Sequence, residues 1–285
     1  VINMNNIKKV GLTALAGALV SVSANAIDMS VTGGASISFS GQEQATTGNG
    51  WSMNDGITFS ASGEMDNGIT VTVTQIIDSS DGAGSAIMDT RSLAFDMGDN
   101  GTLTFTGDGG SSVLGMIDDK TPTANEESWD DVAGADAIPG GTGGLNMFHY
   151  SNSSVGVDGL TLSASYTPSN GSTEVESSED YGLTYTGVEN LEIGIATGED
   201  NTSATAGLDL TQMYATYTMD SISIGVHASE SDSETANADK DFTALGLSYA
   251  VSEDMSVSIN TSTIEYENST LSDQEATGVS ISYTM

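Results

Sequence analysis

The feature that most constrains this chain is a series of segments with a two-residue period. In each of them apolar residues occupy every second position, and Ser, Thr, Gly or Asn fills the positions between. Residues 28–41 are an example, with Val31, Ala35, Ile37 and Phe39 sharing one parity. Because successive side chains of a strand point to opposite faces, the pattern predicts β-strands that are apolar on one face and polar on the other.

We count about 14 such strands, most of them long enough to be tilted membrane-spanning strands. The predicted strands cover residues 28–41, 54–65, 68–77, 86–97, 102–106, 145–152, 160–167, 180–185, 191–197, 208–219, 222–229, 241–250, 255–267 and 276–285. In residues 208–219 the apolar residues change parity near Gln212, which we interpret as a β-bulge.

The connections between these strands alternate between long and short. The long ones are residues 42–53, 78–85, 108–144, 168–179, 198–207, 230–240 and 268–275. The short ones are residues 66–67, 98–101, 153–159, 187–190, 220–221 and 252–254. Tight turns at one rim and long polar loops at the other are typical of an outer-membrane β-barrel. Asp-Asn-Gly at 66–68 and again at 99–101 suits tight hairpins.

Composition excludes several classes of protein. Five basic residues face 40 acidic ones, so the chain lacks the Lys and Arg that phosphate binding needs, and nucleic acid is excluded as a partner. Without cysteine there is no disulfide framework and no thiolate-ligated metal. After the first residues, no window is apolar for the roughly 20 residues that a transmembrane helix needs.

Residues 1–26 have the pattern of a signal peptide. Lys8 and Lys9 precede the apolar run 10–22, and Ala24-Asn25-Ala26 forms a small-residue cleavage site. We therefore expect export through the Sec pathway and a mature β-domain over residues 27–285.

Alternation alone cannot separate a soluble sandwich from a membrane barrel, since both produce it. Small side chains on the polar face and long strands favour a barrel around a water-filled lumen. Tyrosines near strand ends would form an aromatic girdle; they are Tyr166, Tyr181, Tyr185, Tyr249, Tyr266 and Tyr283. The predicted fold is an all-β, transmembrane, antiparallel, up-and-down β-barrel.

The longest connection, residues 108–144, follows the fifth predicted strand. A loop of this length in a compact domain usually has a function. We expect it to fold into the lumen and narrow the pore, with its acidic residues at the constriction: Asp118, Asp119, Glu126, Glu127, Asp130, Asp131 and Asp136.

Two stretches carry a resemblance to a known family. They are FDMGDNGTLTFTGDGGSSVLGMIDD at 95–119 and the terminal strand TGVSISYTM at 277–285. The chain resembles the general diffusion porins of Gram-negative bacteria, in particular the alphaproteobacterial type. In that family an aromatic residue stands third from the end, as Tyr283 does here, and another ends the chain, where this one has Met285.

The resemblance implies a homotrimer in the outer membrane, in contact with lipid and lipopolysaccharide, and a 16-strand barrel as the alternative to 14. It also implies that the third long loop constricts the channel opposite a cluster of arginines. This sequence departs from that arrangement, because beyond the signal peptide it has only Arg91, Lys120 and Lys240 as basic residues.

We therefore predict a channel for passive diffusion of small hydrophilic solutes and ions, with a preference for cations, because a path lined by one sign of charge concentrates the opposite ion. His149 and His227 have no metal-ligand spacing, and no catalytic motif is present, so we predict no enzyme and no cofactor. The acidic loops could still bind Ca²⁺ loosely through their oxygens.

Two other functions remain open at this point. One is a secreted or surface-attached acidic β-rich adhesin or structural protein, and the other is a barrel selective for a single class of substrate.

Overall fold

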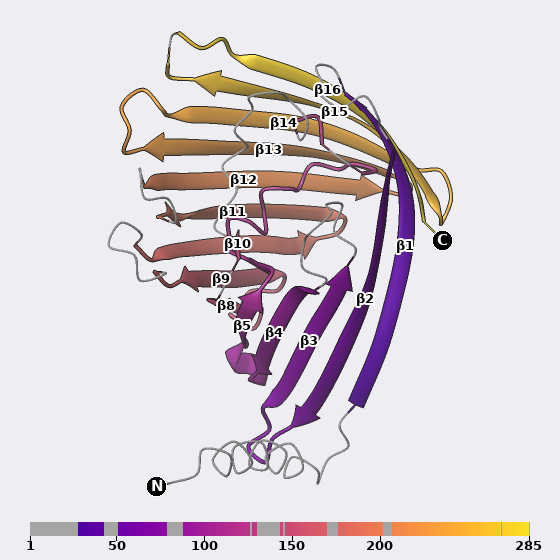
Figure 1. Cartoon of the computed structure of the whole chain (residues 1–285), viewed down its shortest axis with the longest axis vertical. Helices are drawn as coiled ribbons and strands as arrows, with labels where there is room; N and C mark the ends of the chain where they lie inside the picture. The colour runs from indigo at the N-terminus through magenta and orange to yellow at the C-terminus, as the bar shows by residue number, and fades with distance from the viewer. Residues whose placement is uncertain are drawn as a thin grey trace, which may run out of the picture.

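The chain forms a closed antiparallel β-barrel in the computed structural model (Figure 1). The structure describes residues 28–42, 51–78, 88–125, 127–129, 143–144, 146–169, 176–201, 207–268 and 270–284. The expected signal peptide, residues 1–26, lies outside these residues. No helix among the described residues is long and apolar enough to cross a membrane.

Fourteen of the described strands make up the barrel, which confirms the smaller of the two predicted numbers. They are β1 (Asp28–Gln42), β2 (Trp51–Glu64), β3 (Thr70–Asp78), β4 (Met88–Asp96), β5 (Thr102–Asp108), β8 (Met147–Asn152), β9 (Leu160–Thr167), β10 (Ser178–Val188), β11 (Leu191–Asp200), β12 (Leu208–Met219), β13 (Ile222–Ser233), β14 (Lys240–Ala250), β15 (Met255–Tyr266) and β16 (Gln274–Thr284). Two short strands, β6 (Gly110–Ser111) and β7 (Gly143–Gly144), pair with each other inside the long loop.

The barrel closes because the last strand pairs with the first. Tyr283 of β16 lies opposite Ile37 of β1, and Ile281 lies opposite Phe39. Closure leaves no sheet edge with unpaired backbone groups, which a bilayer would not tolerate.

The outward face of the barrel is apolar and the inward face is polar. Val226 and Leu245 are cross-strand partners on the outward face, 50% and 47% exposed. Inward residues such as Ser229 and Ser258 are buried. A continuous exposed apolar band is what a membrane barrel presents to lipid, whereas a water-soluble protein would bury it.

Tyr217, Tyr249 and Tyr283 face outward near the short connections and fit an aromatic girdle. Tyr266 differs from the others predicted for this role. Its ring packs against a buried cluster of Trp129, Phe242, Ala244 and Ile264 inside the barrel.

The short connections use glycines where the sequence predicts tight turns. Gly68 and Gly101 have φ of 83° and 82°, in the left-handed region that favours glycine. The second turn contains the 3₁₀ helix η1 (Gly98–Asn100), which follows β4 directly.

The bulge predicted near Gln212 is wrong. β12 pairs with β11 and with β13 in unbroken registers. Leu210 points inward and is 1% exposed, while Met213 points outward and is 50% exposed. The leucines of β12 therefore lie on the inner face before Gln212 and its methionines on the outer face after it, although the strand itself is regular. The inner position of Leu210 is apolar because the long loop packs against it from inside the barrel.

Candidate functional site

The long loop leaves β5, enters the lumen and runs along the inner wall of the later strands (Figure 1). We call its described inner part, residues 112–125 and 127–129, the strap. At the base of the loop, β6 and β7 pair, and β5 pairs directly with β8. The barrel wall is therefore continuous behind the loop, and the strap is an addition to the lumen and not part of the wall.

The strap first meets β9 and β10 through hydrogen bonds. The backbone N–H of Val113 donates to Oγ of Ser165 at 2.9 Å, and that of Leu114 donates to Oδ2 of Asp180 at 3.5 Å. Ser165 also donates to Asp180 at 3.1 Å. These buried side chains supply acceptors for backbone groups that the loop cannot pair within itself.

An apolar contact follows at β11 and β12. Val113, Leu114 and Ile117 pack against Ala196, Leu210 and Tyr214, and all six are buried. A cluster of this kind is unexpected on the wall of an aqueous lumen, and it anchors the strap by removing apolar surface from water.

In the middle of its course the strap lies against glycines. Gly225 of β13, Gly246 of β14 and Gly278 of β16 occupy one row of the sheet, with Asn260 of β15 between the last two. We call these three glycines the glycine row.

The strap backbone fits this row because a side chain there would occupy its space. A β-carbon added at Gly225 would lie 2.5 Å from Cδ of Pro122, and one at Gly246 would overlap the side chain of Thr121. At Gly278 it would lie 3.2 Å from the Cα of Ser128. Glycine is therefore required by close approach at these positions.

Serines on β15 and β16 hold the tip of the strap. Oγ1 of Thr123 lies 3.3 Å from Oγ of both Ser258 and Ser280. The N–H of Ala124 donates to Oγ of Ser258 at 2.8 Å. Oγ of Ser128 then donates to Oγ of Ser262 at 2.9 Å as the strap returns along the wall.

A second apolar contact ends the described strap. Trp129 packs against Phe242 with ring centroids 4.9 Å apart in an edge-to-face arrangement. The strap is thus fixed at two apolar ends with polar contacts between them, and it follows the inner wall from β9 to β16.

Two of the seven acidic residues predicted for the constriction lie side by side on the strap. Asp119 is exposed and Asp118 is half-buried. Burial raises the pKa of Asp118 to about 6, and the charge of Asp119 adds to this increase. Asp119 also interacts electrostatically with His227, which points inward from β13.

The other predicted acidic residues are placed differently. Glu127 is only 4% exposed and lies in the part of the strap that meets β15 and β16. Glu126, Asp130, Asp131 and Asp136 lie outside the described residues. The prediction that these seven line the constriction therefore stays a prediction.

No basic residue faces the strap from the opposite wall among the described residues. That wall has a row of hydroxyls, formed by Ser60, Thr74, Ser92 and Thr106 on β2 to β5. Arg91 points to the outside, where its Nη2 donates to the carbonyl of Gly107 at 3.2 Å.

The two lysines among the described residues, Lys120 and Lys240, lie over tyrosine rings. Nζ of Lys120 lies 5.6 Å from the ring centroid of Tyr214, and Nζ of Lys240 lies 6.0 Å from that of Tyr266. The hydroxyl of Tyr214 donates to Glu192 on β11. Lys120 is therefore held against the wall as the basic residue of the strap.

Sequence reasoning missed the glycine row and the two apolar contacts. Single glycines within strands are a signal of close backbone approach, and each of these three strands contains one. That the three align in one row depends on the strand registers. Within the described residues, no group of three His, Cys, Asp or Glu side chains is arranged to hold a metal ion.

Comparison with known proteins gives a consistent result. The sequence pattern of the family described as Gram-negative porin matches residues 11–285. A comparison with curated protein sequences found no match.

Three solved structures have a similar fold. A loop-deletion mutant of OmpT, an outer membrane protein of Vibrio cholerae, has a TM-score of 0.61 at 11% identity, covering 90% of this chain and 99% of that chain. OmpF of Salmonella typhi has a TM-score of 0.59 at 11% identity, covering 90% and 97%. An anion-selective porin from Comamonas acidovorans has a TM-score of 0.56 at 12% identity, covering 90% and 100%. At these identities the similarity concerns the barrel fold alone.

Proposed function

This chain belongs to the Gram-negative porin family of outer-membrane channels, and from that premise we propose that small hydrophilic solutes and ions diffuse passively through its lumen, with cations preferred. The strap narrows the path and acts as the size filter. A channel of this kind needs no cofactor and catalyses no reaction. The closed barrel with its outward apolar band also favours a channel over an acidic surface adhesin.

The observation that carries the cation preference is the one-sided charge of the lumen. Asp118 and Asp119 lie on the strap, and the row of hydroxyls on β2 to β5 carries no base. Lys120 is the basic residue of the strap, so negative charge still exceeds positive charge there, and a narrow aqueous path with such an excess attracts cations and repels anions. Since the same fold occurs in a porin described as anion-selective, local charges and not the fold determine the sign.

The test is the reversal potential of the refolded protein in a planar bilayer under a KCl gradient. We expect the sign that corresponds to a higher permeability for potassium than for chloride. The variant D118N/D119N should move the potential toward zero, whereas D66N/D99N, which removes the same charge from the short-turn rim, should leave it nearly unchanged. An anion-selective wild type would refute the proposal.

Solute size provides a second test. Uncharged sugars of increasing size should enter proteoliposomes at rates that fall steeply with size, because the strap excludes large solutes without binding small ones. Saturation of the rate by one sugar would instead indicate a barrel specific for that substrate class.

We also propose a homotrimer, as the family resemblance implies, in contact with outer-membrane lipid and lipopolysaccharide after export by the Sec pathway. Gln75 and Arg91 are cross-strand partners on the outward face, where polar groups suit a protein neighbour better than lipid. An oligomer that dissociates only on heating in SDS, and that Arg91→Leu weakens, would support this assembly.

Loose binding of Ca²⁺ by the acidic loops stays an expectation, to be tested by calorimetric titration.

A further inference from the structure

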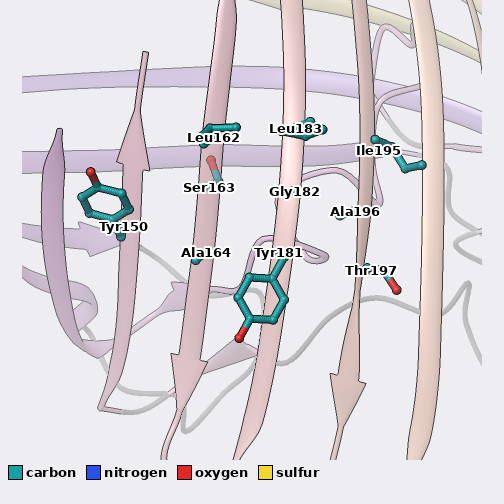
Figure 2. A pocket seen from close by; sticks show the side chains of 10 residues that line it. All are labelled: Tyr150, Leu162, Ser163, Ala164, Tyr181, Gly182, Leu183, Ile195, Ala196 and Thr197. Atoms are coloured by element: carbon teal, nitrogen blue, oxygen red, sulfur yellow. The ribbon is translucent and has the colours of Figure 1, made fainter. Parts of the chain in front are cut away.

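A hollow of about 550 Å³ lies on the outward surface of the barrel, over β8 to β11 (Figure 2). It is distinct from the lumen, because Leu162, Leu183 and Ile195, which line it, are all exposed on the outward face. Tyr150, Ala164 and Tyr181 also line it, and in Figure 2 they lie on the side opposite Leu162 and Leu183.

The hollow results from a small residue placed between two large ones. Tyr150, Ala164 and Tyr181 are direct cross-strand partners on three adjacent strands. Gly182 and Ala196 also border the hollow, but their side-chain positions face the lumen, so neither places a side chain on the outward surface. Cross-strand neighbours normally fill such a position with contacting side chains, and the methyl group of Ala164 cannot do so.

Hydrogen bonds hold the two tyrosine rings apart. The hydroxyl of Tyr150 donates to the carbonyl of Asn100 at 2.7 Å, at the turn before β5. The hydroxyl of Tyr181 donates to Oε2 of Glu179 at 2.9 Å, toward the opposite end of the strands. In Figure 2 the two hydroxyls accordingly point in opposite directions, so only ring surfaces border the hollow. Both hydrogen bonds hold the rings in orientations that leave the hollow open.

We propose that this hollow binds one acyl chain of a membrane lipid, which stays there longer than the chains that contact the rest of the barrel. The hollow is continuous with the apolar band that meets the bilayer, so acyl chains are the groups that reach it. A lined depression lets a chain contact protein atoms on several sides, whereas the convex wall offers contact on one side only.

The residues that line the hollow suit the acyl chain of a lipid better than its polar headgroup. No charged side chain lines the hollow, and both tyrosine hydroxyls already donate to protein acceptors. The carboxylate of Glu179, which accepts the hydrogen bond of Tyr181, would repel a phosphate placed beside that tyrosine. A second copy of the protein is a poorer occupant, because its outward face is the same convex apolar wall and would span the hollow without filling it.

The test uses a spin-labelled stearic acid in dimyristoylphosphatidylcholine vesicles that contain the full mature protein. Electron paramagnetic resonance separates motionally restricted chains from freely moving ones. In Ala164→Phe the ring would fill the hollow, and we expect the restricted population to fall by one chain per barrel. Ala215→Phe is the matched control, because Ala215 is an outward alanine on β12 that does not line the hollow.

Unchanged single-channel conductance in both variants will show that they are folded, since the hollow does not touch the lumen. Equal restricted populations in wild type, A164F and A215F would overturn the proposal. So would a change of oligomeric state confined to A164F, because it would identify a second copy as the occupant. Neither outcome depends on the ion preference of the channel, so the two proposals can fail separately.

Discussion

Trp129 of the strap and Phe242 of β14 form an edge-to-face aromatic pair inside the barrel, with ring centroids 4.9 Å apart. Phe242 is 1% exposed, so the strap shields it completely from the lumen. The pair fixes the returning end of the strap on the same wall that holds its beginning. The width of the channel therefore depends on an apolar contact as well as on the hydrogen bonds between strap and wall.

Removal of this aromatic contact should release the returning end of the strap. Truncation of a buried phenylalanine costs about 3–5 kcal/mol, and here the loss falls on strap docking, since the strand pairing of β14 is unaffected. We expect Phe242→Ala to raise single-channel conductance and current noise. Phe59→Ala, a truncation on the lipid-facing side of β2, should change neither. Conductance equal to that of the wild type in F242A would contradict the assigned role.

The glycine row leads to a second prediction, which concerns how the strap docks on the barrel wall. In Gly246→Val the new side chain would occupy the position of Thr121, and overpacking of this kind costs about 1–3 kcal/mol. The displaced strap should become sensitive to trypsin at Lys120, with the cut visible as two fragments on a gel. Gly34→Val is the control, because Gly34 has no neighbouring atom within reach of a β-carbon. Equal resistance of both variants would mean that the strap does not depend on the row.

The sequence predicts the barrel well because its signals are local. Alternation within each segment and the lengths of the connections produce fourteen strands, and two of these, Leu160–Thr167 and Leu208–Met219, match to the residue. The path of the strap is not predictable in this way. It depends on which inward residues of neighbouring strands share a row, as Gly225 and Gly246 do, and the register of each pair of strands determines this.

The incorrect bulge illustrates the same limit. Leu208 and Leu210 break the polar pattern of the lumen face, and a bulge is the simplest local explanation for such a break. The actual cause is a contact with Leu114, nearly a hundred positions earlier in the chain. An apolar residue on the lumen parity of a barrel strand is therefore a signal that a loop docks there, and Phe242 and Ile264 follow the same rule.

The raised pKa of Asp118 predicts that selectivity depends on pH. Its value of about 6 lies above the ordinary 3.8 mainly because burial disfavours the charged form. As the pH falls through 6, the strap loses this charge and the preference for cations should decrease, as measured by reversal potentials between pH 7.5 and 5. In Asp118→Asn the step near pH 6 should be absent.

The same shift has a consequence for stability with a defined sign. Between about pH 4 and pH 6 the folded protein binds a proton at Asp118 that the unfolded chain does not, so stability falls as the pH rises through this window. Trypsin cleavage at Lys120 should accordingly be slower at pH 5 than at pH 7.5, after correction for enzyme activity with an unfolded peptide. A cleavage rate in D118N that keeps the wild-type pH dependence would assign the effect to another group.

Substitution of Lys120 tests whether the position of a charge or the net charge of the barrel determines the ion selectivity. Its Nζ lies over the ring of Tyr214 on the strap side of the lumen, beside Asp118 and Asp119 in sequence. Lys120→Met removes the positive charge nearest to these carboxylates, so the field along the path becomes more negative and the preference for potassium over chloride should increase. Lys240→Met makes the same change of charge at the start of β14, where Lys240 lies over Tyr266, and Debye screening in 0.1 M salt limits its influence to about 10 Å. We therefore expect the reversal potential to shift in K120M and to stay near the wild-type value in K240M. Equal shifts in the two variants would mean that the total charge of the barrel sets its selectivity, and that the strap acidic residues have no special position in the path.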